Sequence, residues 1–370
     1  MEEKDYISSH DLRLLNSCFY RTHAHLINSF LQSNATTELT FIECLMHILK
    51  VSDYQPYNSY IKTNLTEGEQ MQEVINFFHS LSPELGVQVE EIFSRNQTSY
   101  DIKLVSDPNN KFFGLNFITE SKKKEKLQFN VSFINDISSM LNLAHEISHA
   151  VSNRTITSYE LLKNLRKDQE EYEEEYEAFH TMNMQTSVDC VVEIESHITE
   201  LLFLYYMIKN NIITKEQSKN FINERNNSFK NNLIEIITEY EAFELLGYPV
   251  THTSFSKFAV WSEKNNPYLL KKLKTKIQLE EKDPKNTNCA KYKFRYVVAE
   301  MVSTVWYKKF IASTNAEKRK MIKDFISFLQ NNAITDIRTA ISDLLDMSLE
   351  ELGRKFYEIK VKESKQNLEF

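Results

Sequence analysis

Residues 141–151, LNLAHEISHAV, place a glutamate between two histidines that are four positions apart: His145, Glu146 and His149. On a helix, residues four apart lie one turn above each other on the same face, so both imidazoles can reach one tetrahedral zinc ion. Glu146 is rotated by ~100° from His145, which lets its carboxylate approach a water on that metal. The remaining positions predict an amphipathic helix, with a core-facing side formed by Leu143, Ile147, Ala150 and Val151.

The third ligand of such a zinc site must come from elsewhere. The residues after His149, VSNRT, lack the Gly and His that continue the motif in metzincins, which disfavours that class. The next candidate segment is 190–208, CVVEIESHITELLFLYYMI, a strongly apolar predicted helix. Its polar residues Glu193, His197 and Glu200 share another face, and burying them is costly without a partner such as a cation. Spacing alone leaves both Glu193 and His197 open as the third ligand.

The rest of the chain predicts a mainly α-helical protein. Only 5 Gly and 6 Pro occur in 370 residues, too few for the tight turns of a β-sandwich or barrel. Three runs rich in β-branched and aromatic residues, YDIKLVS, KFFGLNFIT and KLQFNVSFI, predict a small antiparallel sheet just before the HExxH helix. We expect a helical region over 1–95 and a catalytic domain over 96–370. The acidic stretch 167–179 is expected to be a solvated helix or loop.

Composition also limits the classes of partner. The net charge is −8 and no basic stripe is present, so nucleic acid is not expected as a partner. No run approaches the ~18 apolar residues of a membrane span. The four cysteines form no CxxC pair, and MEEKDYISSHDLRLL lacks the apolar core of a signal peptide. These features predict a cytoplasmic protein, with secretion lacking a cleaved signal still open, and they leave the oligomeric state undetermined.

The two predicted helices together resemble zinc metallopeptidases of the thimet oligopeptidase and oligoendopeptidase F type. That family has HExxH on one helix and, on a second, Glu-x-x-Ser with a further Glu four residues past the Ser. Here the second pattern is Glu193-Ile194-Glu195-Ser196 followed by Glu200. The resemblance implies one zinc per chain, with Glu193 as its third ligand. It also implies that Glu200 orients a ligating imidazole.

The resemblance extends over roughly residues 98–360, with a shorter region before the motif than in the family. The segment KYKFRYVVAEMVSTVW is similar to the Tyr-rich segment that faces the metal in that family. By resemblance, Tyr296 would donate to the oxyanion and Tyr292 would contact substrate; both could instead be core aromatics. The chain departs from the family at Ser148, where Gly is common. The family usually also has a Gly shortly after its last Tyr, where Ala299 and Glu300 stand here, and 279–291 lacks the His that helps to stabilise the oxyanion.

The resemblance implies a zinc-dependent metalloendopeptidase that acts on a peptide or protein substrate, with Glu146 as general base. Two alternatives remain. One is a catalytically weakened, peptidase-like binding protein that keeps zinc for stability; the intact Glu146 argues against it. The other is a dedicated proteinase, such as a toxin or effector, that acts on one protein target; a reduced lid would suit it.

Overall fold

The computed structural model describes residues 61–94, 100–105, 113–118, 126–132, 136–152, 175–247, 251–265, 290–331 and 336–368, with a few isolated residues elsewhere. In the strands and at several helix ends, among them 175–187 and 290–292, it describes the backbone alone. Most of residues 1–56 and the larger part of the acidic stretch 167–179 lie outside the described residues.

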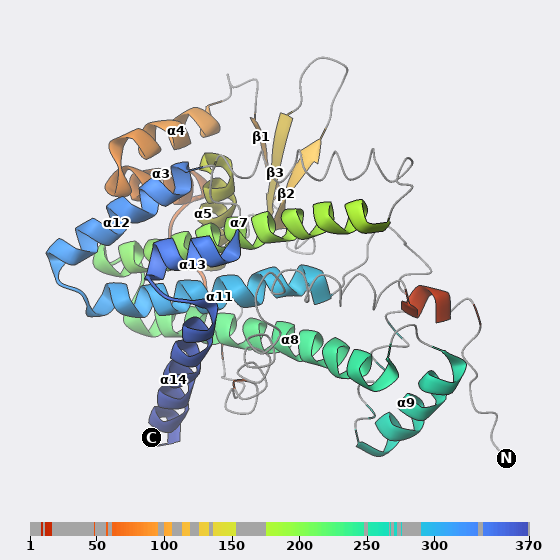
Figure 1. Ribbon diagram of the computed structural model, residues 1–370. Coiled ribbons are helices and arrows are strands. Elements are labelled where there is room, and N and C mark those ends of the chain that lie inside the picture. Colours follow the sequence, from red (N-terminus) through yellow and green to blue (C-terminus); the bar gives the residue numbers. More distant parts are fainter. Residues whose placement is uncertain are drawn as a thin grey trace.

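Three long helices form the body of the molecule: α7 (Glu175–Lys209), α8 (Lys215–Leu246) and α11 (Ala290–Ala312). Helix α11 packs along both α7 and α8, and Figure 1 shows the three running side by side. The apolar side chains that α11 buries recur at helical spacing, among them Val298, Met301, Val302 and Val305. The mainly helical class predicted from the composition is confirmed.

Two shorter helices support the HExxH helix from the N-terminal side. Helix α3 (Glu67–Leu81) begins with a capping box formed by Thr66 and Glu69, and α4 (Pro83–Phe93) begins at a proline preceded by the capping Ser82. Both contact α5 (Ile137–Val151). Phe77 and Phe78 of α3 belong to the same buried cluster as the apolar side chains of α5, α7 and α11. Residues 61–94, the described part of the predicted N-terminal region, therefore share one hydrophobic core with the helices that follow.

A three-stranded sheet precedes α5 in the chain and lies next to it (Figure 1). The strands are β1 (Tyr100–Val105), β2 (Phe113–Ile118) and β3 (Lys126–Ser132), in the order β1-β3-β2. β2 and β3 pair antiparallel, whereas β1 and β3 pair parallel. The prediction of an antiparallel sheet was therefore wrong for β1. The apolar runs mark which segments are extended, but the strand order depends on pairing between distant segments, which local sequence does not encode.

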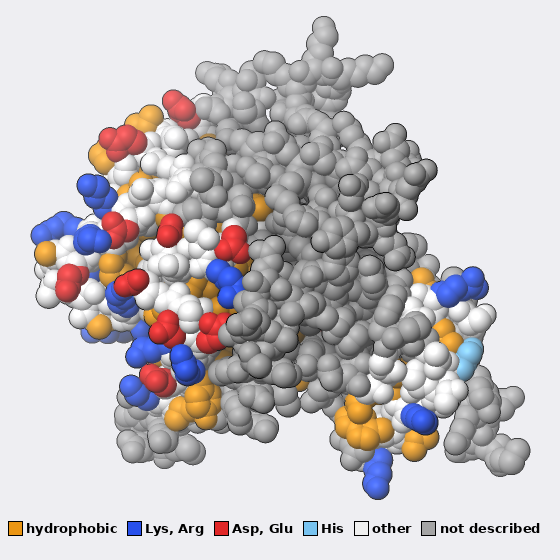
Figure 2. Space-filling model, viewed as in Figure 1, with side chains coloured by type: hydrophobic (Ala, Val, Ile, Leu, Met, Phe, Trp, Pro, Cys, Tyr) orange, Lys and Arg blue, Asp and Glu red, His pale blue; other side chains and the backbone are white. Residues whose placement is uncertain are grey.

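The remaining described helices are α9 (His252–Asn265), α12 (Asn315–Gln330), α13 (Ile337–Leu345) and α14 (Leu349–Leu368). Helices α13 and α14, which follow α11 in the chain, both pack against it. On the face shown in Figure 2, acidic and basic side chains are interspersed over the described residues at the left of the view. Within the described part of the chain, no helix has the length and apolar character needed to cross a membrane.

Candidate metal centre

Helix α5 brings His145 and His149 together. Asp136 caps the helix by accepting a hydrogen bond from the Ser139 backbone N–H at 2.8 Å. Leu143 and Ile147 are fully buried and hold the opposite side of the helix against the core. The two imidazoles consequently share one face, with 3.1 Å between their Nε2 atoms. This is the one-turn spacing that the sequence motif predicts.

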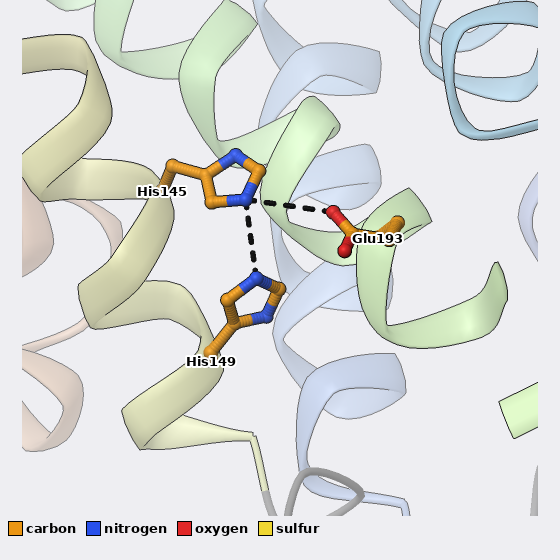
Figure 3. A group of neighbouring side chains, drawn as sticks. All are labelled: His145, His149 and Glu193. Carbon is orange, nitrogen blue, oxygen red and sulfur yellow. Dashed lines mark hydrogen bonds and ion pairs between the residues drawn. The ribbon is translucent and has the colours of Figure 1, made fainter. Parts of the chain in front are cut away.

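The third member of the group is Glu193, which lies on α7. Its Oε2 is 3.5 Å from His145 Nε2. One ligand atom from each of His145, His149 and Glu193 lies within 4.8 Å of the other two, and Figure 3 shows the three side chains converging. Among the described residues, this is the one group of His, Cys, Asp and Glu side chains with such spacing, so these three can hold a metal ion. His197, the alternative ligand left open by spacing, is not part of the group.

The charge states of His149 and Glu193 suit a cation. Burial would lower the pKa of His145, but its hydrogen bond to Glu193 and the charge of Glu146 outweigh this and raise it, so a bound cation would take the place of a proton there. Burial, aided by the nearby charge of His145, lowers the pKa of His149 to about 3, so its imidazole is neutral near pH 7. Burial alone would raise the pKa of Glu193, but the charge of Arg295 and a hydrogen bond from His145 outweigh it and hold that pKa well below its usual range. A neutral imidazole and an ionised carboxylate are the forms that bind a metal.

Glu200 holds the other side of the His145 ring. Its Oε1 is 2.5 Å from His145 Nδ1. A carboxylate in this place accepts the Nδ1 proton, so that Nε2 of His145 can offer its lone pair to a cation that replaces the Nε2 proton. This is the position that the resemblance implied for Glu200.

Glu146 is the buried carboxylate next to this group. The residue is 6% exposed, and its Oε2 has no hydrogen-bond partner among the described residues. Burial raises the pKa of Glu146 to about 7; the charge of His145 opposes this rise and that of Glu193 adds to it. An unpartnered carboxylate with such a pKa is suited to accept a proton near neutral pH.

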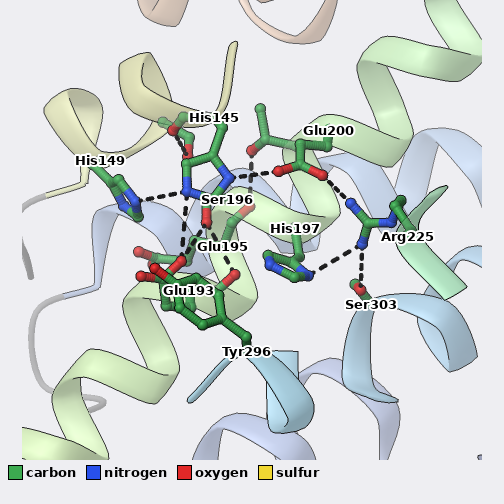
Figure 4. Close-up of polar contacts among 12 residues, drawn as sticks. His145, His149, Glu193, Glu195, Ser196, His197, Glu200, Arg225, Tyr296 and Ser303 are labelled. Carbon is green, nitrogen blue, oxygen red and sulfur yellow. Dashed lines mark hydrogen bonds and ion pairs between the residues drawn. The ribbon is translucent and has the colours of Figure 1, made fainter. Parts of the chain in front are cut away.

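A partly buried arginine, Arg225 of α8, links the group to two further carboxylates. It forms ion pairs with Glu200 and, at 2.5 Å, with Glu300 of α11. Its Nη2 is also 3.1 Å from His197 Nδ1 (Figure 4). The same Nδ1 is 3.2 Å from Glu300 Oε2. Glu300 is thus a charge partner inside the protein.

Sequence reasoning missed Arg225 and Arg295 entirely. Arg225 lies in a polar run of α8 whose local pattern gives no signal of burial. Glu300 did carry a signal, because it is a lone acid within the apolar run VVAEMV. The two arginines are found only when the helices are assembled.

The predicted tyrosines lie on α11. Tyr296 is partly buried, and its ring stacks with that of His197 at a centroid distance of 6.2 Å. Its hydroxyl oxygen accepts a hydrogen bond from Arg295 Nη2 at 2.9 Å, and Arg295 Nε is 3.4 Å from Glu193 Oε1. Tyr296 therefore faces the metal group. Tyr292 belongs to α11, but its side chain lies outside the described residues.

Comparison with protein-family models, with curated proteins and with solved structures found no match for this chain.

Proposed function

We propose that the protein is a zinc-dependent metalloendopeptidase. The observation that carries this proposal is the combination of three convergent ligand side chains with Glu146, a buried carboxylate that has no hydrogen-bond partner among the described residues. A site that served only to stabilise the fold would have no use for such a base. The resemblance of the two helices to the oligopeptidase family supports the same function. We include the helical metallopeptidase fold of that family in the proposal.

The donor set fits zinc. Two imidazole nitrogens and one carboxylate oxygen are the ligands of many catalytic zinc sites, which keep a fourth position open for water or substrate. Structural sites usually fill all four positions with protein ligands. His197 does not belong to the three-residue group. A group of three therefore favours a catalytic site over a structural one.

The chemistry divides between the ion and the protein. Bound zinc would supply a water of lowered pKa and polarise the scissile carbonyl. Glu146 accepts the proton of the attacking water and then delivers it to the leaving amine. Tyr296 would donate a hydrogen bond to the carbonyl oxygen as negative charge develops there. Glu200 holds His145 in the orientation that this arrangement needs. The products would be two peptides, one with a new carboxylate and one with a new amine.

The test compares zinc content and hydrolysis in the wild type and in Glu146→Gln. We expect one zinc per chain in both proteins. Digestion of mixed peptides and of proteins, read by mass spectrometry, should show cleavage by the wild type and a loss of at least ~10²-fold in the variant, because Gln cannot accept the proton. His149→Ala should lose the metal.

Three results would count against the proposal. Equal turnover by Glu146→Gln would remove the general base. A zinc-loaded wild type that cleaves nothing would favour the peptidase-like binding protein. Cleavage of a single folded protein, with no cleavage of peptides, would favour a dedicated proteinase over a general endopeptidase.

A further inference from the structure

His197 lies between a metal-group histidine and Tyr296. It follows Glu193 by four residues on α7, so the two side chains leave the same face of the helix. Its ring centroid is 6.0 Å from that of His145 and 6.2 Å from that of Tyr296. The side chain is 13% exposed. An imidazole is thus built into the wall of the site, although it is not one of the three converging ligands.

One ring nitrogen of His197 is held by charged partners. Nδ1 is 3.1 Å from Arg225 Nη2 and 3.2 Å from Glu300 Oε2. The shortest contact of this triangle joins Arg225 to Glu300 at 2.5 Å, so the carboxylate already has its charge partner. A guanidinium can only donate hydrogen bonds. Nδ1 is therefore best matched as an acceptor, which places the single proton of a neutral imidazole on Nε2.

The second ring nitrogen faces the other way. Figure 4 shows Nδ1 turned toward Arg225, while the opposite edge of the ring is turned toward Glu193 and Tyr296. The described residues supply no hydrogen-bond partner for Nε2. A donor directed into the site from here would lie on the same side as the Tyr296 ring, which stacks on His197 at an interplanar angle of 30°.

We propose that His197 is a further catalytic residue, whose Nε2–H donates a hydrogen bond to the scissile carbonyl oxygen as that oxygen becomes an oxyanion. The inference rests on the proposed function. No bond to His197 forms or breaks, and its proton stays on Nε2. Arg225 and Glu300 are positioning residues that fix the tautomer. His197 would thereby supply the donor that the resembling family takes from a His in a segment where this chain has none.

The test uses two polar, uncharged replacements that mimic different ring nitrogens. The amide nitrogen of Gln in His197→Gln can reach the position of Nε2, whereas that of Asn in His197→Asn reaches only the position of Nδ1. With a peptide that the wild type cleaves, we expect kcat to fall ~10²–10³-fold in His197→Asn, the usual loss for one oxyanion donor. His197→Gln should stay within about tenfold of the wild type. KM and zinc content should change little in both, since the bond forms only in the transition state.

A second measurement does not need turnover. A phosphinic peptide, whose tetrahedral phosphorus group resembles the reaction's transition state, should bind His197→Asn ~10²-fold or more weakly than the wild type. It should bind His197→Gln nearly as well as the wild type. The uncleaved peptide should bind all three proteins alike when each also carries Glu146→Gln. Circular dichroism of each variant checks that the fold is intact.

The outcomes separate this inference from the function on which it rests. Cleavage by the wild type, with equal kcat and equal phosphinic-peptide affinity in His197→Asn, overturns the role of His197 and leaves the peptidase proposal standing. Loss of zinc in both His197 variants would make His197 a ligand and also overturn the inference. A zinc-loaded wild type that cleaves nothing overturns the peptidase proposal and this inference with it.

Discussion

Tyr296 is the residue at which the predicted chemistry can be tested most cleanly, because its hydroxyl can be removed without removing its ring. Arg295 can only donate, so in their 2.9 Å contact the tyrosine oxygen is the acceptor. The Tyr296 ring packs on His197. The guanidinium carbon of Arg295 lies over the same ring, 4.8 Å from the ring centroid. The hydroxyl is thus held at the metal group by contacts that the ring itself would keep.

We expect Tyr296→Phe to lower kcat by ~10²-fold with little change in KM, because the hydrogen bond strengthens only in the transition state. Steady-state kinetics on a cleaved peptide measure this. With His197 as a second donor, the loss should lie at the lower end of the usual range. The exposed Tyr57 offers a control, since Tyr57→Phe should leave kcat unchanged. Wild-type kcat in a folded Tyr296→Phe enzyme would make this tyrosine a packing residue only.

At the scale of elements, the site is the meeting point of four helices. α5 supplies both histidines, α7 supplies Glu193 and Glu200, α8 supplies Arg225, and α11 supplies Glu300. Arg225 is the one described residue that pairs with carboxylates on both α7 and α11. Its removal would leave the buried Glu300 and the partly buried Glu200 without their cation. Removing one partner of a buried ion pair typically costs roughly 3–5 kcal/mol.

We therefore expect Arg225→Met to lower the free energy of unfolding by about 3 kcal/mol at pH 7, measured by denaturant titration in a chelator. Arg319, an exposed arginine on α12, gives the matched control: Arg319→Met should change stability by less than ~0.5 kcal/mol. Equal stability of the two variants would mean that the Arg225 network contributes nothing to the fold.

The ion pair between Arg225 and Glu300 also makes the stability of the fold depend on pH. Burial alone would raise the pKa of Glu300, but the charge of Arg225, with a smaller contribution from the nearby His197, lowers it to about 2. A carboxylate with a lowered pKa stabilises the folded state above its unfolded pKa of ~4 and loses this effect as the pH falls toward 2. The stability difference between the wild type and Arg225→Met should therefore shrink as the pH falls from about 4.5 to 2. A difference that stayed constant over this window would assign the effect to packing.

The elements also indicate which parts of the site a sequence can predict. α5 and the central part of α7 are marked by local apolar spacing, Leu143 with Ile147 and Ile194 with Ile198, and all four side chains are buried. The spacing of four residues then places His145 with His149 on one face of α5, and Glu193 with His197 on one face of α7. Arg225 meets partners 25 and 75 positions away. No local period encodes such a contact, and the same limit explains why the parallel pairing of β1 with β3 was missed.

At the scale of the whole molecule, the metal group joins parts of the chain that only folding brings together. His145 and His149 belong to α5, which packs on α3 and α4, whereas Glu193 belongs to α7, which packs on α11. Helices α3, α5, α7 and α11 contribute to one buried cluster. An ion bound by all three side chains binds the folded chain and not the unfolded one, so binding and folding are linked.

Zinc should therefore raise the thermal stability of the wild type. At free zinc 100-fold above the dissociation constant, linkage adds about 2.7 kcal/mol, which for a chain of this size corresponds to a rise in Tm of about 3.5 °C. Calorimetry in a zinc buffer and in excess chelator measures the difference. Glu146→Gln should show the same rise, since Glu146 is not a ligand, whereas His149→Ala should show almost none. A rise of equal size in His149→Ala would place the stabilising metal elsewhere on the chain. Its absence from the wild type would mean that the three converging side chains do not hold zinc at this concentration, and the peptidase proposal would fall with it.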